Sequence, residues 1–283
     1  MITQIYSKTA RQLQTLTFSM GGPQPVDTGL LIVDVKGLGG LKSTVNTLGG
    51  VTSPGVELNY TKVNQRQIEI TIILDGGATG DTKAGRELIR RHFPIWKGMT
   101  LGVVSGDVTY EIDAVVESVD INMFSRNENA DITLMCPNPF FKKLPPNGGY
   151  LHQDGRPKLL TNEGDYPTPV IFGINFSGRA GDVTIQRLDG TQKVKVYMDV
   201  VEDILGRPIQ MFDKIDIDPA IGKKRATLIA SNGATYSVLS AIDWGESDWV
   251  FLQPGISQFH KTASFNNGFV DVVYFYDELY SGV

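Results

Sequence analysis

The sequence predicts a mainly β protein, with a β-rich α+β N-terminal domain that contains one helix and a C-terminal antiparallel β-sandwich. Glycine supplies 31 of the 283 residues, above the usual share of about 7%, and this excess favours a chain with many turns. Short segments of alternating apolar and polar residues recur in both halves, as half-buried strands require. A single segment places its apolar residues at helical spacing.

The first half begins with strands around glycine-rich turns. Residues 30–35 and 41–47 are predicted strands on either side of the turn at 37–40. Residues 66–74 (RQIEITIIL) alternate over their whole length, so their isoleucines are expected on one face of a sheet.

The helix is predicted over about 81–92 (DTKAGRELIRRH). Asp81 or Thr82 is a plausible N-cap, and Pro94 helps to end the helix. The apolar stripe is expected to consist of Ala84, Leu88 and Ile89, continued by Phe93.

The remaining positions of this helix are basic. Two interpretations stay open: a solvated helix face, or a contact with a neighbouring subunit or a phosphate. The candidate inter-subunit residues are Arg86, Arg90 and Arg91.

Residues 99–104 are a predicted strand, and residues 108–123 form a longer one with a break in its pattern. Apolar residues lie at even positions as far as Val116 and at odd positions from Val119 onward. This slip near 117–118 predicts a β-bulge or bend. Cys136 is the only cysteine, in phase with the apolar face of the next strand, and is interpreted as a core residue rather than a nucleophile or sensor.

The chain divides at a segment rich in proline and glycine. The predicted domains are residues 1–142, a linker and loop over 143–165, and a β-sandwich over 166–283. Strands alone are expected in the last part. Hairpin turns of two residues are predicted there at Asp189-Gly190 and Asn232-Gly233, because both dipeptides tolerate positive φ.

Charge and hydropathy exclude some classes of protein. With 26 Lys and Arg against 31 Asp and Glu, the net charge is 26 − 31 = −5, which argues against a nucleic-acid binder that neutralises phosphates. The longest strongly apolar stretches, such as residues 170–176, fall far below the ~18 residues of a membrane-spanning helix. The first twenty residues lack the apolar region of a signal peptide.

The sequence contains no P-loop, GxSxG or HExxH motif, and we predict no catalytic residue, no metal site and no cofactor. Glu111 and Asp113 point the same way from one strand. Paired carboxylates can cleave glycosides, but such alternation is more typical of the polar face of a half-exposed strand. Three further carboxylates, at Asp213, Asp216 and Asp218, do not match the EF-hand spacing for calcium.

The segment 243–249 (DWGESDW) is the candidate peripheral binding surface. Asp243, Trp244 and Trp249 could form a sugar platform, with aromatic faces for stacking and a carboxylate for hydroxyl groups. A protein contact and a packed corner between two strands are the alternatives.

Residues 41–141 resemble the distal tail protein (Dit) family of long-tailed bacteriophages. The resemblance depends on the order of a helix that ends in RRHFPIWKGMTL, the bulged strand YEIDAVVESVDINMFSR and the strand ADITLMCPNPFF. It implies an N-terminal domain related to tail-tube proteins and a C-terminal galectin-like or jelly-roll-like sandwich.

The resemblance also implies a function. Family members are structural proteins, not enzymes, and six copies form a ring through which DNA passes. The ring joins the tail-tube protein to the tail-tip hub protein, while the C-terminal domain is a docking point for receptor-binding or peripheral baseplate proteins. Such a protein is made in the host bacterial cytoplasm and resides in the virion. A lectin-like module for host attachment is the alternative function.

Overall fold

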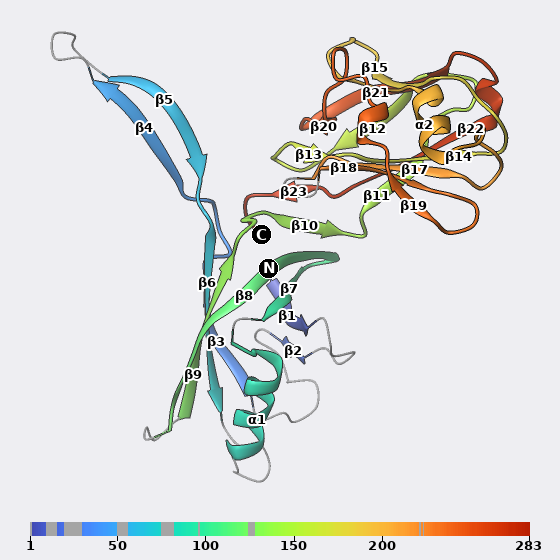
Figure 1. Ribbon diagram of the computed structural model, residues 1–283. Helices are drawn as coiled ribbons and strands as arrows, with labels where there is room; N and C mark the ends of the chain where they lie inside the picture. The colour runs from blue at the N-terminus through green and yellow to red at the C-terminus, as the bar shows by residue number, and fades with distance from the viewer. Residues whose placement is uncertain are drawn as a thin grey trace. The chain divides into compact units, whose positions relative to one another are not determined.

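In the computed structural model, the chain forms two compact units (Figure 1), Met1–Pro145 with Tyr280–Val283 (unit 1) and Pro146–Leu279 (unit 2). The structure describes residues 2–9, 16–19, 30–49, 56–74, 82–95, 97–123, 128–220, 222 and 224–283. Nearly all of the regular elements are strands, which confirms the mainly β prediction.

Unit 1 is built on an antiparallel sheet in which neighbouring strands are not always consecutive in the sequence. In spatial order its strands are β2 (Leu16–Ser19), β1 (Ile2–Thr9), β7 (Gly98–Ser105), β8 (Val108–Asn122), β9 (Glu128–Cys136), β6 (Arg66–Leu74) and β3 (Leu30–Lys36). The strand β10 (Phe141–Leu144) pairs with the first half of β8. The predicted strands at 30–35 and 41–47 do not pair with each other, because β3 pairs with β6 whereas β4 (Ser43–Gly49) pairs with β5 (Val56–Val63).

The β-bulge predicted in the long strand is present. The register between β8 and β9 shifts between Val116 and Ser118, so Glu117 is the extra residue. Val116 therefore faces the core, and Val119 and Ile121 beyond the bulge return to the same face and pack against the core.

The helix α1 (Thr82–His92) covers the apolar face of this sheet. Its buried residues are Gly85, Ile89 and His92. The prediction for Ala84 was wrong, because Ala84 is exposed and Gly85 takes the inward position. A Cβ at Gly85 would lie 3.1 Å from a methyl group of Leu30, so glycine lets the helix approach the sheet closely.

Unit 2 is a sandwich of two antiparallel sheets. One sheet has the order β11 (Asn147–Tyr150), β22 (Val270–Tyr276), β14 (Ile171–Phe176), β17 (Lys214–Asp218), β18 (Arg225–Ile229) and β19 (Thr235–Ser237). The other has the order β12 (Lys158–Asn162), β21 (Gly255–Ala263), β15 (Val183–Arg187) and β16 (Lys193–Val196). Short elements complete the unit: β13 (Thr168–Pro169) paired with β20 (Phe251–Leu252), and the 3-10 turns Leu239–Ala241 and Asn267–Phe269.

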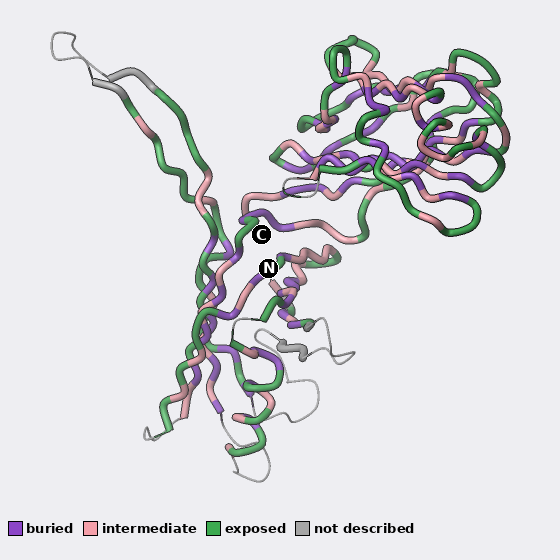
Figure 2. Tube along the Cα trace, in the orientation of Figure 1, coloured by how far each residue is buried: buried purple, intermediate pink, exposed green. Residues whose placement is uncertain are grey.

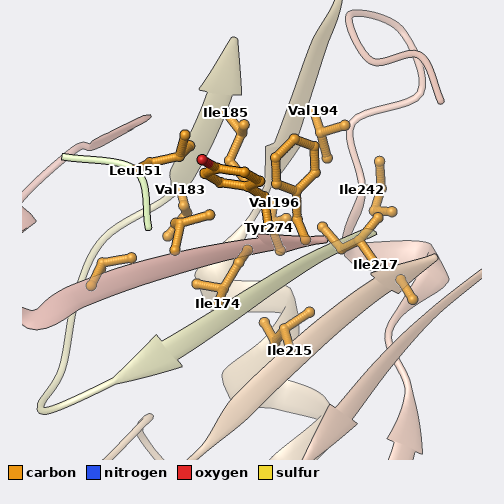
Figure 3. Packing of buried hydrophobic residues seen from close by; sticks show 14 of the residues in the cluster. Leu151, Ile174, Val183, Ile185, Val194, Val196, Ile215, Ile217, Ile242 and Tyr274 are labelled. Atoms are coloured by element: carbon orange, nitrogen blue, oxygen red, sulfur yellow. The ribbon is translucent and has the colours of Figure 1, made fainter. Parts of the chain in front are cut away.

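The core of unit 2 lies between these sheets. Figure 3 shows Ile174 and Ile215 from one sheet with Val183 and Val194 from the other. Both predicted hairpins occur, with Gly190 and Gly233 at positive φ. Their loops are longer than the two residues predicted, because the N–H of Arg187 donates to the carbonyl of Gln192 and that of Ala230 to the carbonyl of Ala234.

The second half does not consist of strands alone, contrary to the prediction. Residues Met198–Leu205 form a helix, α2, which ends at Gly206 in the left-handed conformation (φ 67°). The carboxylate of Asp182 accepts a hydrogen bond from the backbone N–H of Met198 at 3.0 Å, at the start of this helix.

Two strands occupy part of the segment predicted as a linker and loop. Residues Asn147–Tyr150 and Lys158–Asn162 are edge strands of the two sheets of unit 2. At the other end of the chain, β23 (Leu279–Tyr280) lies where the chain passes from unit 2 back to unit 1. There Val283 donates a backbone hydrogen bond of 3.2 Å to Leu38.

Candidate assembly surfaces

The paired carboxylates Glu111 and Asp113 belong to a network of surface ion pairs. Glu111 accepts hydrogen bonds from the Tyr6 hydroxyl at 2.7 Å and the Lys8 ammonium at 2.5 Å. Asp113 accepts one from Lys142 at 3.1 Å. Burial, and secondly the hydrogen bond to Glu111, raise the pKa of Tyr6. Each carboxylate thus has a cation of its own, which is typical of a charged strand face.

The exposed face of the unit 1 sheet carries a row of acidic residues. Asp34 lies opposite Thr71, Thr71 opposite Asp131, and Asp131 opposite Asp120, across the four strands β3, β6, β9 and β8. Glu69 lies two residues along the same face of β6. All four carboxylates are exposed.

The pairing of Asp120 with Asp131 is unfavourable for folding. Like charges directly opposite each other on neighbouring strands are destabilising, and no ion pair of either residue with Lys or Arg is found in the part of the chain that the structure describes. Asp131 accepts hydrogen bonds from the Thr71 hydroxyl at 2.7 Å and the Asn129 amide at 3.4 Å. Elsewhere in the row, the Lys36 ammonium lies 3.7 Å from Asp34 and 4.0 Å from Glu69.

The segment 243–249 forms an exposed corner whose side chains interact with one another and with nearby residues of unit 2. Trp244 is 45% exposed, and its ring centroid lies 5.1 Å from that of Trp249, which packs partly against the core. Asp243 accepts a hydrogen bond from the Tyr197 hydroxyl at 2.5 Å and lies 3.6 Å from the Lys195 ammonium. The Tyr197 hydrogen bond in particular lowers the pKa of Asp243. One aromatic face is therefore accessible, while the carboxylate expected to bind sugar hydroxyls is engaged within the protein.

The three arginines of the candidate inter-subunit set lie in different surroundings. Arg86 forms an ion pair of 2.6 Å with Glu128 of its own chain, and both side chains are mostly buried. Arg90 and Arg91 are exposed. Next to them, burial and secondly the charge of Arg91 lower the pKa of His92.

Arg90 borders an apolar groove at the end of α1. The groove has a volume of about 490 Å³ and is lined by Arg90, Phe93, Pro94, Ile95, Val119, Ile121 and Met123. It forms because the apolar stripe of β8 beyond the bulge continues past the last turn of the helix. Ile95 and Met123 at its edge are 51% and 49% exposed.

The three aspartates weighed for calcium each belong to a separate ion pair. Asp213 is bound by Arg207 at 2.7 Å, while Asp216 pairs with Lys214 and Asp218 with Arg225. Burial opposes ionisation of Asp213, but hydrogen bonds from Arg207 and from two backbone N–H groups lower its pKa. Among the described residues there is no group of His, Cys, Asp and Glu that could hold a metal ion.

The hairpin β4–β5 is a further exposed element of unit 1 (Figure 2). Its two strands pair with each other over seven residues. Its described side chains are mostly exposed, including Val45 (55%) and Tyr60 (53%). No third strand pairs with this hairpin in the described part of the chain, and a two-stranded hairpin by itself is marginally stable in water.

No model of a known protein family matches this chain, and no curated protein matches it. Comparison of the structure with solved structures does find similar folds.

The similarity extends over both units. The crystal structure of the Dit protein of phage SPP1, described as a paradigm of the hub adsorption apparatus in phages that infect Gram-positive bacteria, covers 98% of this chain and 98% of its own, with a TM-score of 0.66 and 14% identity. This chain has the Dit fold. Two chains from structures of the phage p2 baseplate in its activated conformation, with Sr and with Ca, match with TM-scores of 0.48 and 0.49 at 8% identity. They cover 96% and 98% of this chain, and 97% and 98% of their own.

The match to the Dit fold covers both units of the chain, whereas the sequence resemblance covered residues 41–141. Sequence reasoning missed the acidic row, because it becomes visible only once the register of four strands is known. It also missed the groove, although the phase slip in 108–123 was a usable signal. In the described part of the chain, no helix is both long and apolar enough to cross a membrane.

Proposed function

We propose that this chain is a virion structural protein of a long-tailed phage. It forms a hexameric ring at the distal end of the tail tube, joins the tail-tube protein to the tail-tip hub protein, and lets DNA pass. The observation that carries the proposal is the match to the SPP1 Dit protein, which spans 98% of both chains. The protein is made in the host cytoplasm and functions in the virion rather than as an enzyme.

The acidic row of unit 1 supports a role as a DNA conduit. Asp34, Asp120 and Asp131 are aligned across adjacent strands of one exposed face. An anionic surface repels phosphates, so DNA can move past it without binding. We therefore place this face toward the channel of the ring.

The β4–β5 hairpin supports assembly with neighbouring copies. Its outer edges present backbone N–H and C=O groups that can pair with another chain. Unit 2, with its exposed corner at 243–249, is the docking platform for receptor-binding or peripheral baseplate proteins.

Location in the virion tests this proposal directly. Antibodies raised against the purified chain, coupled to gold particles, should label purified virions at the tail tip and nowhere else. Antibodies against the major capsid protein serve as the matched control and should label heads only. Absence of the chain from purified virions, measured by mass spectrometry, would rule the proposal out.

A further inference from the structure

The segment Tyr280–Val283, here called the strap, belongs to unit 1 although it follows unit 2 in the sequence. The chain therefore crosses between the units twice, from Pro145 to Pro146 and from Leu279 to Tyr280. The whole of unit 2 lies between these two crossings. The contacts of the strap thus decide whether unit 2 is attached to unit 1 at one point of the chain or at two.

The buried side chain of Arg66 holds the strap. Its Nη2 donates a hydrogen bond to the carbonyl of Ser281, and its Nη1 donates to the carbonyls of Gly37 and Gly39. Its Nε donates to the carbonyl of Pro139 at 2.8 Å. The planar guanidinium has five N–H donors in a fixed fork, so one side chain binds the strap, the turn at 37–40 and the segment before β10 at the same time.

Aromatic and apolar contacts complete the attachment. The ring of Tyr280 meets that of Tyr110 edge to face, with 5.4 Å between the centroids, and Val283 packs with Tyr280 against the unit 1 core. A Cβ at Gly282 would lie 3.0 Å from the backbone carbonyl carbon of Gly39. Glycine at this position therefore lets the strap lie directly on the turn.

The two crossings are also linked to each other. On the unit 1 side, β23 pairs with β10, the strand that precedes the first crossing. On the unit 2 side, the Asn147 amide donates a hydrogen bond of 3.0 Å to the carboxylate of Glu278, which is 3% exposed. The two ends of unit 2 are therefore held beside each other.

The strap can leave without the loss of either core. The buried residues of unit 1 and of unit 2 form two separate clusters, and the strap contributes only partly buried side chains, which pack against the first. The other strands of the unit 1 sheet keep a pairing partner without it, since β10 also pairs with β8. Release of the strap is therefore a local opening rather than an unfolding of the unit.

We propose that the strap is a releasable second tether of unit 2, with Arg66 as the positioning residue that docks it. With the strap docked, two linked crossings restrain the motion of unit 2. With the strap released, a single crossing remains, and unit 2 moves independently of unit 1. The strap thereby sets how freely unit 2 can reorient. This inference concerns a single chain and does not depend on the proposed ring.

A variant of the full chain that lacks residues 280–283 tests the tether. This variant and the intact chain both carry a fluorophore on Leu188→Cys, an exposed position of unit 2, while the native Cys136 is buried and does not compete for the label. Time-resolved fluorescence anisotropy should show a segmental motion on the nanosecond scale whose amplitude is about twofold higher, or more, in the shortened chain. The thermal midpoints of both units should stay within about 5 °C of those of the intact chain.

Two outcomes overturn the proposal. Equal anisotropy decays of the two proteins would show that the strap does not restrain unit 2. Failure of unit 1 to fold in the shortened chain would show that the strap is part of the fold of that unit and cannot be released.

A point variant tests the contact between the strap and the turn in a chain of full length. Gly282→Val places a side chain against Gly39, so amide hydrogen exchange of residues 280–283 should become about tenfold faster or more. Gly268→Val is the matched control, because a Cβ at Gly268 meets no atom within 4 Å, and it should leave this exchange unchanged. Equal exchange in the two variants would contradict the close packing of the strap.

A second pair of variants tests the role of Arg66. Arg66→Lys keeps the positive charge but loses the fork of donors, so it should also speed exchange in the strap. Arg86→Lys replaces another mostly buried arginine of unit 1, which pairs with Glu128, and the exchange of the strap should not change. If both variants free the strap equally, or neither does, Arg66 is not the residue that docks it.

Discussion

Cys136 shows how the position of one residue in a strand sets its chemistry. The side chain is fully buried in the unit 1 core, where burial raises the pKa of the thiol to about 12. The thiolate is the reactive form, so the folded protein should not react with a thiol reagent at pH 8.

The measurement is a titration with Ellman's reagent. We expect less than one-tenth of a thiol per chain to react in the folded state within an hour and one thiol per chain to react in urea. Because an unfolded thiol ionises near pH 8.5, the free energy of unfolding should also fall as the pH rises from about 8.5 toward 12. Rapid reaction of the folded chain at pH 8 would contradict the burial of this residue.

The two tryptophans of the exposed corner should differ in their effect on stability. Trp249 packs partly against the core, whereas Trp244 is 45% exposed. Trp249→Ala should lower the free energy of unfolding of unit 2 by about 2–3 kcal/mol, somewhat below the cost for a fully buried tryptophan. Trp244→Ala should cost about 1 kcal/mol or less.

Urea unfolding followed by far-UV circular dichroism measures both values. Equal losses for the two variants would show that Trp244 is also a core residue. Loss of binding to a glycan by Trp244→Ala, with stability retained, would instead support the lectin-like alternative.

At the scale of elements, the bulge in β8 predicts which residue can be deleted without disrupting the strand. Glu117 is the extra residue between Val116 and Ser118, so its deletion leaves the alternation and the pairing with β9 continuous. Unit 1 should therefore still fold, with a thermal midpoint within about 5 °C of the wild type.

Deletion of Val115 is the matched control. It carries Val116 to the exposed face and Glu117 toward the core, and a buried unpaired charge is strongly destabilising. Unit 1 should then fail to fold, as judged by circular dichroism. If both deletions behave alike, the assigned bulge is wrong.

The acidic row places the like charges of Asp120 and Asp131 opposite each other on β8 and β9. Asp120→Asn removes the repulsion between Asp120 and Asp131, which lie opposite each other, so it should raise the free energy of unfolding by a few tenths of a kcal/mol, on the order expected for cross-strand pairs. The gain should shrink as salt is raised from about 0.05 to 1 M, because ions screen exposed charges.

Glu87→Gln on the exposed surface of α1 offers a comparison with the same change in net charge. If it gives the same salt-dependent gain, the effect reflects total charge rather than this pair.

The elements that could be predicted from the sequence are those specified by their own residues. The alternation of RQIEITIIL predicted β6, and the spacing of apolar residues in 81–92 predicted α1. Gly190 and Gly233 predicted the positions of the two hairpin turns. The helix α2 was missed because it follows directly on the alternating strand KVKV and spans only eight residues.

The features that could not be predicted depend on contacts between distant segments. The edge strands β11 and β12 have little alternation of their own and form by pairing with β22 and β21. Phe212 has positive φ in a loop whose Asp213 carboxylate accepts hydrogen bonds from Arg207 and from the backbone N–H of the distant Ser231, and nothing in the sequence QMFD indicates this. The acidic row required the register of β8 with β9.

At the scale of the whole molecule, the proposed function depends on surfaces of both units. Unit 1 contributes an exposed acidic sheet face, a hairpin that pairs only with itself among the described residues, and an apolar groove. Unit 2 contributes the exposed corner at 243–249 on a packed sandwich.

The mass of the assembled particle tests the central claim most directly. Native mass spectrometry of the purified chain at micromolar concentrations, with negative-stain images of the same sample, gives the number of subunits and the symmetry. We expect a closed ring of six copies, 6 × 31.0 kDa = 186 kDa, with an open central channel. A stable monomer at all concentrations tested, or a closed particle with another number of subunits, would contradict the account.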